Sequence, residues 1–303
     1  MIEFKPVRLE DKQTIERYTM PSGIYNCDLA FANMYCWQAM YHSAWAVIDG
    51  FLVIRFHIGG GEKIGYMQPV GEGDFAGIIP ALRADAHAHG QRLRIIGLTD
   101  EGREMIRNMH AGLFAFESDR ALEDYVYNAE DLRNLTGRRY QPKRNHINRF
   151  VENNPTWTYE EITPATLPEC LEMDKEWYRR SLQREGDAEE RDLGDEGIAL
   201  RTAMEHYEEL GLEGGLIRVY GEVVAFTIGD RLSADTYDVH FEKAYGELQG
   251  AYAMINREFA RWVRARHPEI RYLNREDDMG VEGLRKAKQS YYPDLMVEKH
   301  TAV

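Results

Sequence analysis

The sequence predicts a mixed α/β protein with two domains, and two observations support this fold class. The chain has 303 residues, of which 44% are hydrophobic and 29% are charged, so it is long enough for two packed cores and has an ordinary globular composition. The order strand, helix, hairpin, helix, strand occurs in the first half of the chain and recurs in the second. We therefore expect two divergent copies of one unit, residues 1–152 and 153–303, each a mixed sheet flanked by helices.

The elements of the first half follow from local patterns. Residues 4–7 predict a strand, and residues 8–18 predict a helix with its apolar residues facing inward. Asp49-Gly50 predicts a two-residue hairpin turn between β-rich runs, because such turns need residues that tolerate positive φ. A helix at 75–90 and a strand at 93–98 complete the unit.

The second half repeats this order. Residues 157–162 predict a strand and residues 163–182 a helix, which is followed by a hairpin at 215–230, a helix at 251–267 and a strand at 270–274. The acidic segment 184–197 has few apolar anchors, so its composition predicts a solvated mobile loop. The alternative is a lid over a site.

The charge of the chain limits its partners. A net charge of −14 and a sequence pI near 5.2 argue against non-specific binding to DNA or another polyanion. Against this background, residues 137–150 carry five Lys/Arg and one His with no acid. Pro142 predicts the start of a helix there, with Lys143, Ile147 and Phe150 at helical spacing.

This basic segment has two interpretations. Lys143, Arg144, His146 and Arg149 are candidate ligands of a phosphate or carboxylate, because charged nitrogen donors bind these groups well. The alternative is a basic connector helix that forms salt bridges with the acidic body, although exposed pairs of this kind add only about 0–1 kcal/mol each.

A polar strand and a glycine turn are the chemically informative part of the second half. Residues 236–244 alternate in polarity, which predicts Asp238, His240 and Glu242 on one face of a strand. Polar side chains on a central strand are unfavourable unless that face lines a cleft. The turn at 245–250 leads into a helix, and a helix N-terminus with unpaired amides favours an anion such as a diphosphate. A purely structural role for the glycines is the alternative.

A charged run follows the strand that ends at Asn274. Residues 275–278 precede Gly280 and a helix at 281–292. The run lacks the spacing of an EF-hand calcium loop, so we interpret it as an exposed helix cap.

At this point the residues resemble a known family. The segments DLRNLTGRRYQPKRNHINRF, FEKA and LNREDDMGVEGLRKAKQSYYP resemble mostly uncharacterised bacterial proteins related to the C-terminal domain of phosphatidylglycerol lysyltransferase, which is built from two GNAT acyltransferase units. The resemblance covers nearly the whole chain. It implies a splayed central strand followed by a phosphate-binding turn, which Gly246, Gln249, Gly250 and Ala251 approximate.

The resemblance implies transfer of an acyl or aminoacyl group from acyl-CoA or aminoacyl-tRNA to an amine or hydroxyl of a small molecule, peptide or lipid headgroup. Such a reaction needs a base and an acid. Glu242, His240 and Asp238 are the candidate bases, and Tyr291 or Tyr292 is the candidate acid, of which we favour Tyr292. The alternative is a non-catalytic GNAT-fold module that binds acyl-CoA or another anionic metabolite.

The resemblance also suggests where coenzyme A binds. The glycine turn would hold its diphosphate, with Lys143, Arg144 and Asn274 as further ligands. We expect no metal, because His87 and His89 lie two positions apart on a predicted helix and do not share a face.

The cysteines and the apolar runs suggest a compartment. Cys27, Cys36 and Cys170 are odd in number and lack CxxC spacing, which is typical of reduced thiols in a cytosolic protein. No apolar run approaches the roughly 18 residues of a membrane span, so we expect a cytoplasmic protein without an integral membrane segment.

Overall fold

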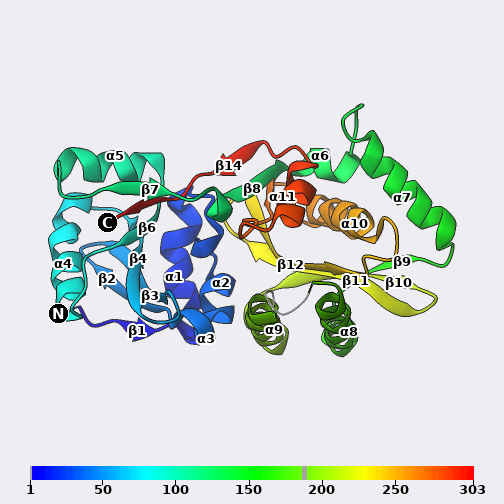
Figure 1. The fold of residues 1–303 in the computed structure, drawn as a ribbon, viewed down its shortest axis with the longest axis horizontal. Coiled ribbons are helices and arrows are strands. Elements are labelled where there is room, and N and C mark those ends of the chain that lie inside the picture. Colours follow the sequence, from blue (N-terminus) through cyan, green and yellow to red (C-terminus); the bar gives the residue numbers. More distant parts are fainter. Residues whose placement is uncertain (1, 186–189) are drawn as a thin grey trace. The chain divides into compact units, whose positions relative to one another are not determined.

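The computed structural model describes residues 2–185 and 190–303, and it is an α/β protein with two mixed sheets flanked by helices (Figure 1). Its contacts divide the chain into two compact units. Unit 1 comprises Met1–Tyr125, Glu276–Lys288 and Leu295–Val303, and unit 2 comprises Val126–Arg275 and Gln289–Asp294.

This division differs from the predicted boundary at residues 152 and 153. The basic helix α7 (Gln141–Asn153) packs on α10 (Ala251–Arg266), which places it inside unit 2. Strand β8 (Asp124–Asn128) pairs with β13 (Tyr272–Asn274) of the second half. Pairings between segments so distant in sequence leave no local signal, so the pattern of repeated elements does not reveal them.

The sheet of unit 1 is mixed, since β4 and β6 are parallel and the other described neighbours are antiparallel. Its strand order is β1 (Lys5–Pro6), β2 (Ala44–Ile48), β3 (Phe51–Ile58), β4 (Lys63–Met67), β6 (Ile95–Leu98), β15 (His300–Ala302) and β7 (Phe116–Ser118), and β5 (Val70–Gly71) pairs with β3. The helices are α1 (Lys12–Thr19), α2 (Phe31–Cys36), α3 (Gln38–Tyr41), α4 (Phe75–Ala88) and α5 (Asp100–Met109), and α11 (Glu282–Gln289) lies at the change back to unit 2.

Local sequence explains the central part of this unit. The predicted hairpin turn is confirmed, because Ile48 pairs with Phe51 across Asp49 and Gly50, whose φ angles are 47° and 86°. Both values are positive, as this turn requires. The apolar faces of α4, β3 and β6 pack into one buried core together with β4, and this core contains Val53, Ile78, Leu82, Ile95 and Leu98.

Unit 2 is built on strands in the order β8, β13, β12 (Thr236–Ala244), β11 (Glu222–Arg231), β10 (Glu213–Val219) and β9 (Thr158–Glu161). Helices α8 (Leu167–Glu185) and α9 (Glu190–Glu205) cover one face, and α10 lies on the other face with α6 (Ala129–Asn134) and α7 (Figure 1). Strand β14 (Leu295–Val297) precedes β15 in the chain.

The acidic segment 184–197 is not the loop that its composition predicts. Helix α8 extends to Glu185 and α9 begins at Glu190, so the described part of the segment is helical, while residues 186–189 lie outside the described residues. In the second half of α9, Ala199, Leu200, Ala203 and Met204 are buried at helical spacing, and α9 packs on α8.

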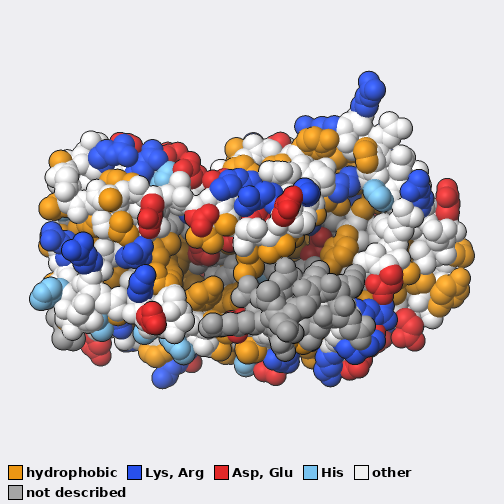
Figure 2. Space-filling view, viewed as in Figure 1, with side chains coloured by type: hydrophobic (Ala, Val, Ile, Leu, Met, Phe, Trp, Pro, Cys, Tyr) orange, Lys and Arg blue, Asp and Glu red, His pale blue; other side chains and the backbone are white. Residues whose placement is uncertain are grey.

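Two features are relevant to possible partners, namely the distribution of charge on the surface and the apolar composition of the helices. Acidic and basic side chains are intermixed on the face of each unit shown in Figure 2. Among the residues that the structure describes, none of the helices combines the length and apolar composition that a membrane crossing requires.

Candidate active site

Strand β12 coincides with the predicted polar strand, but a β-bulge interrupts its alternation. Val239 pairs with Gly229 and Phe241 pairs with Ile228 of the neighbouring strand, so His240 is an extra residue on β12. A bulge of this kind changes which face the following side chains occupy.

The predicted grouping of the three polar residues on one face is therefore wrong. Tyr237 and Glu242 both contact α10, whereas Lys243 contacts α8 and α9. Asp238 directly follows Tyr237 and so faces away from α10, and His240 Nδ1 lies 3.7 Å from its carboxylate. Glu242 is thus separated from Asp238 and His240 by the sheet itself.

Glu242 forms a nearly buried ion pair. Its Oε1 lies 2.8 Å from Nη2 of Arg275, and the two side chains are only 11% and 12% exposed. Asn256 Nδ2 of α10 donates to Oε2 of Glu242 at 3.3 Å. Arg275 and Asn256 therefore fix both carboxylate oxygens.

This pair lies where two parallel strands stop pairing. Strands β12 and β13 pair only from Thr236 to Asp238 and from Tyr272 to Asn274. Beyond that point β12 continues to Ala244, and Arg275 directly follows β13. The ion pair consequently occupies the opening between the two strands, which matches the splayed central strand that the resemblance implies.

Lys143 of α7 completes the group. Its Nζ lies 3.7 Å from the ring centroid of Tyr291, and the guanidinium of Arg275 lies 5.1 Å from the same ring. Burial lowers the pKa of Lys143 to about 8, with a further contribution from the charge of Arg275 that Glu242 partly offsets. Two cations and one carboxylate make this site locally positive in a protein of net charge −14.

The remaining part of the basic segment has mainly structural contacts. Ile147 and Phe150 are buried and Lys143 is half-buried, as the helical spacing predicted. Arg144 donates to the backbone carbonyls of Leu135 and Gly137. These contacts connect α7 to the end of α6, so charge reversal at Arg144 would disturb the fold rather than leave it intact.

His146 and Arg149 are exposed on α7, and Arg139 forms an ion pair with Asp131 at 2.6 Å. Each interpretation of the basic segment 137–150 therefore applies to some of its residues. Lys143 belongs to the candidate site, and Arg139 forms the kind of salt bridge expected of a connector.

The glycine turn before α10 is packed against α7. Gly250 has φ of 89° at the N-cap, and a Cβ on it would lie 2.2 Å from the backbone oxygen of His146. Ala251 is buried, and its amide donates to Leu248 O at 3.0 Å. Gly246 and Gln249 are exposed. Gly250 therefore has a structural reason to be glycine, and the diphosphate role of the turn remains a prediction.

The other predicted residues lie away from Glu242 or make different contacts. His240 Nε2 lies 2.9 Å from Asp230 Oδ1, and this pair is nearly buried. Asn274 is fully buried at the end of β13. Tyr292 is 45% exposed and its ring contacts Tyr140. Of the two tyrosines that we considered as acids, it is Tyr291 that contacts the site.

The charged run 275–278 is not the exposed cap that we predicted. Arg275 is nearly buried in unit 2, and Asp278 is fully buried in unit 1, where Arg285 binds it through two nitrogens, each at 2.8 Å. Sequence reasoning missed Arg275: its position directly after the predicted strand 270–274 can be read from the sequence, but the pairing of that strand with β12 cannot.

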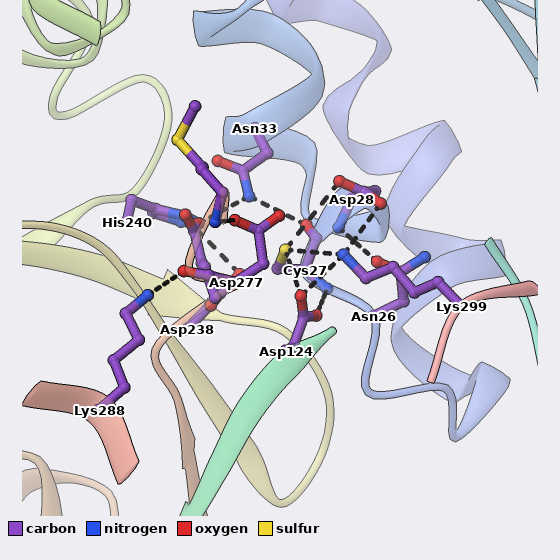
Figure 3. Close-up of polar contacts among 12 residues, drawn as sticks. Asn26, Cys27, Asp28, Asn33, Asp124, Asp238, His240, Asp277, Lys288 and Lys299 are labelled. Atoms are coloured by element: carbon purple, nitrogen blue, oxygen red, sulfur yellow. Dashed lines mark hydrogen bonds and ion pairs between the residues drawn. The ribbon is translucent and has the colours of Figure 1, made fainter. Parts of the chain in front are cut away.

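A second buried polar group lies in unit 1 (Figure 3). Lys299 Nζ lies 2.7 Å from Asp124 Oδ1, 3.2 Å from Asp28 and 3.6 Å from the sulfur of Cys27. Burial and the charge of Asp124 raise the pKa of the Cys27 thiol well above its ordinary value. Burial therefore disfavours the reactive thiolate form of Cys27. Cys36 and Cys170 are also buried, and neither forms a disulfide bond within the described residues.

The fold and the opening between β12 and β13 define a class of protein. The architecture is that of tandem GNAT-like proteins: the chain superimposes on a tandem GNAT protein from the clavulanic acid biosynthesis pathway with a TM-score of 0.51, at 10% identity over 99% of this chain and 98% of the other. The particular family follows from the sequence. The chain belongs to the family of the phosphatidylglycerol lysyltransferase C-terminal domain, which matches residues 20–303.

Solved structures agree with this assignment. A conserved protein of unknown function from Bacteroides thetaiotaomicron is 42% identical over 100% of this chain and 99% of its own, with a TM-score of 0.93. The structure of L-PGS from Bacillus licheniformis is 14% identical over 100% of this chain and 93% of its own, with a TM-score of 0.66. At 14% identity, the similarity to L-PGS is evidence for a shared fold alone.

One curated relative matches part of the chain. An uncharacterised protein of Mycoplasmoides gallisepticum is 21% identical over 182 residues, which cover 58% of this chain. The matched region spans about half of that relative, 54% of its length.

Proposed function

We propose that this protein transfers an acyl or aminoacyl group from an activated donor to an amine or hydroxyl acceptor. The observation that carries this proposal is the Glu242–Arg275 pair in the opening between β12 and β13, with Lys143 beside it. In this proposal the carbonyl of the donor lies beside this pair. Membership of a lysyltransferase family supports the same class of reaction.

Each step of the transfer has a candidate group in the site. The acceptor nitrogen or oxygen attacks the carbonyl carbon of the donor, a new C–N or C–O bond forms, and negative charge develops on the carbonyl oxygen. Glu242 takes the acceptor proton, because a carboxylate held by two donors is positioned for this role. Collapse of the intermediate breaks the C–S or ester C–O bond, and the proton passes from Glu242 to the leaving group.

The positive groups suit the charge that develops. Arg275 and Lys143 are N–H donors in a largely desolvated site, where they stabilise an oxyanion or a donor phosphate more strongly than in water. The carbonyl oxygen of Asn256 is buried and accepts no hydrogen bond from the described residues, so it is a candidate acceptor for an N–H of the attacking amine.

The proposed donor is a coenzyme A thioester or an aminoacyl-tRNA. Both carry phosphates, which lie close to the transferred group in aminoacyl-tRNA and at the far end of the pantetheine arm in coenzyme A. The close packing of Gly250 on α7 and the bonded amide of Ala251 occupy part of the turn that would hold a coenzyme A diphosphate. These contacts favour aminoacyl-tRNA as the donor.

The test measures loss of the donor ester or thioester by the full chain. We would incubate it with lysyl-tRNA or acetyl-CoA in the presence of phosphatidylglycerol vesicles or a peptide amine, and compare Glu242→Gln with wild type. We expect donor discharge by wild type and a rate at least about 100-fold lower for the variant.

Glu172→Gln is the control, because Glu172 lies on α8, on the opposite face of the sheet from Glu242, and is 76% exposed. It should retain the wild-type rate. Equal rates for Glu242→Gln and wild type would exclude Glu242 as the base. Saturable donor binding without discharge for any donor and acceptor would instead support the binding module.

A further inference from the structure

A cavity of about 300 Å³ lies in unit 2 on the face of the sheet that α8 and α9 cover. Lys243 of β12 lines it, and Glu242, the next residue along the strand, faces α10. The cavity is therefore on the opposite side of the sheet from the candidate active site. Its walls include Trp177, Tyr178 and Leu200, which are apolar or aromatic.

Two of the charged groups in the cavity are already paired with each other. Lys243 forms an ion pair with Glu196, and its Nζ lies 3.7 Å from the ring centroid of Trp177. The side chain of Lys243 is only 4% exposed. This pair is complete without a ligand.

Asp174 is different. It is 8% exposed and lines the cavity, and in the described part of the chain no hydrogen bond or ion pair involves its carboxylate. Burial raises the pKa of Asp174, although the charge of Lys243 partly opposes this. A largely buried carboxylate without a donor among the described residues is unfavourable unless water or a ligand contacts it, and the cavity gives such access.

Arg201 is the counterpart of Asp174 in the cavity wall. No described residue forms an ion pair or hydrogen bond with its guanidinium. Its positive charge acts on Asp174 without contacting it. Among the described residues, the cavity thus offers a largely buried carboxylate and an exposed guanidinium, neither of which is paired with another side chain.

We propose that this cavity binds a small zwitterion, a free amino acid, whose ammonium group contacts Asp174 and whose carboxylate contacts Arg201. A guanidinium can bind a carboxylate through two parallel hydrogen bonds, and a buried carboxylate is a strong acceptor for an ammonium group. The volume is at the lower end of small-molecule sites, which suits an amino acid. Trp177, Tyr178 and Leu200 would contact its side chain.

This site goes beyond the proposed transfer reaction and does not depend on it. Because the sheet separates it from Glu242, its ligand is not the molecule that reacts there. Binding can therefore be measured without a donor and without turnover.

The test is calorimetric titration of the full chain with each of the common L-amino acids. We expect at least one to bind with one-to-one stoichiometry. Its methyl ester, which lacks the carboxylate, and its N-acetyl derivative, which lacks the ammonium group, should each bind at least about tenfold more weakly, equivalent to about 1.4 kcal/mol.

Substitutions in the cavity test whether the amino acid binds there. Asp174→Asn and Arg201→Gln should each weaken it at least about tenfold, while Glu172→Gln, on the same helix but 76% exposed, and Glu242→Gln should leave it unchanged. Asp174→Asn should fold with an equal or higher thermal midpoint, because it removes a desolvated charge. Failure of every amino acid to bind, or binding that is insensitive to Asp174→Asn, would overturn the proposal.

Discussion

Lys143 is the residue of the candidate site whose charge depends on pH near neutrality. Its pKa is about 8 in the folded protein, below the ordinary value of 10.5, because burial disfavours the ammonium form. Between these two values the unfolded state binds more protons than the folded state, so the stability of the wild type rises with pH in this interval. Below pH 8 the unfavourable contribution is fully present.

Replacing this lysine should therefore stabilise the protein at neutral pH. Lys143→Met keeps an unbranched side chain on the Tyr291 ring and removes the desolvated charge. We expect the free energy of unfolding at pH 7 to rise by about 1 kcal/mol, after a discount for solvent screening, and the gain to shrink between pH 8 and 10.5. Urea denaturation at several pH values measures it.

The control is Lys286→Met, since Lys286 is 73% exposed on α11, and it should give no comparable pH-dependent gain. A loss of stability for Lys143→Met that is the same at pH 7 and pH 10 would contradict the argument. Transfer activity should fall in this variant even as stability rises.

The sequence indicated some site residues and not others for clear reasons. The position of Lys143 beside Ile147 and Phe150 follows from helical spacing, which is a local property. Arg275 lies in a charged run that looks exposed in sequence, and only the pairing of β13 with β12 places it beside Glu242. Partners across a sheet are set by non-local pairing, which one sequence does not show.

At the scale of elements, β12 shows how a correctly predicted strand can have wrongly predicted faces. Its bounds match the predicted residues 236–244, but the bulge at His240 depends on the register with β11. Alternating polarity assumes a regular strand. The bulge is what directs Glu242 toward α10 and away from the other two predicted bases.

Packing of α7 on α10 depends on a missing side chain at Gly250. A Cβ there would lie 2.2 Å from the backbone oxygen of His146, and φ is 89°. Gly250→Ala should therefore lower the free energy of unfolding by about 3 kcal/mol, from strain and steric conflict together. Because α7 carries Lys143, donor affinity should fall as well.

Gly221 provides a matched control for the strain alone. Its φ is 88° and a Cβ on it would meet no atom within 4 Å. Gly221→Ala should lower stability by about 1 kcal/mol, as measured by the same urea denaturation. If the two variants are equally stable, the predicted contact between α7 and the α10 N-terminus is incorrect.

At the scale of the whole molecule, two adjacent carboxylates in unit 1 should have opposite effects on acid stability. Burial alone would raise the pKa of Asp278, but hydrogen bonds from Arg285, Tyr125 and Gly280 outweigh it and hold the pKa well below its ordinary value. Burial raises the pKa of Asp277 to about 7. Asp278 therefore stabilises the fold above about pH 4, and Asp277 destabilises it as it ionises.

Substitution by asparagine should separate these effects. Asp278→Asn should cost about 3 kcal/mol at pH 7, because it removes the partner of a buried ion pair, and the loss should diminish as the pH falls below 4. Asp277→Asn should raise stability at pH 8 and have little effect at pH 4. Unfolding curves recorded from pH 3 to pH 8 would test both, and a parallel pH dependence for the two variants would refute the assignment.

The repeated order of elements predicts two units, but it does not predict which segments of the chain belong to each unit. Unit 1 also includes two segments from late in the chain, Glu276–Lys288 and Leu295–Val303. The strand His300–Ala302 is only three residues long, and a pattern that short does not indicate which sheet it joins. Its place between β6 and β7 is a tertiary property.

The position of β15 between β6 and β7 has a consequence during synthesis of the chain. Because β15 pairs with β6 on one side and β7 on the other, the sheet of unit 1 stays open until the ribosome has synthesised residue 302. Throughout elongation, the edges of β6 and β7 present unpaired backbone groups that other chains can bind. A chain that lacks residues 300–302 would therefore keep two strand edges of unit 1 unpaired, and a segment far along the sequence is what closes this sheet.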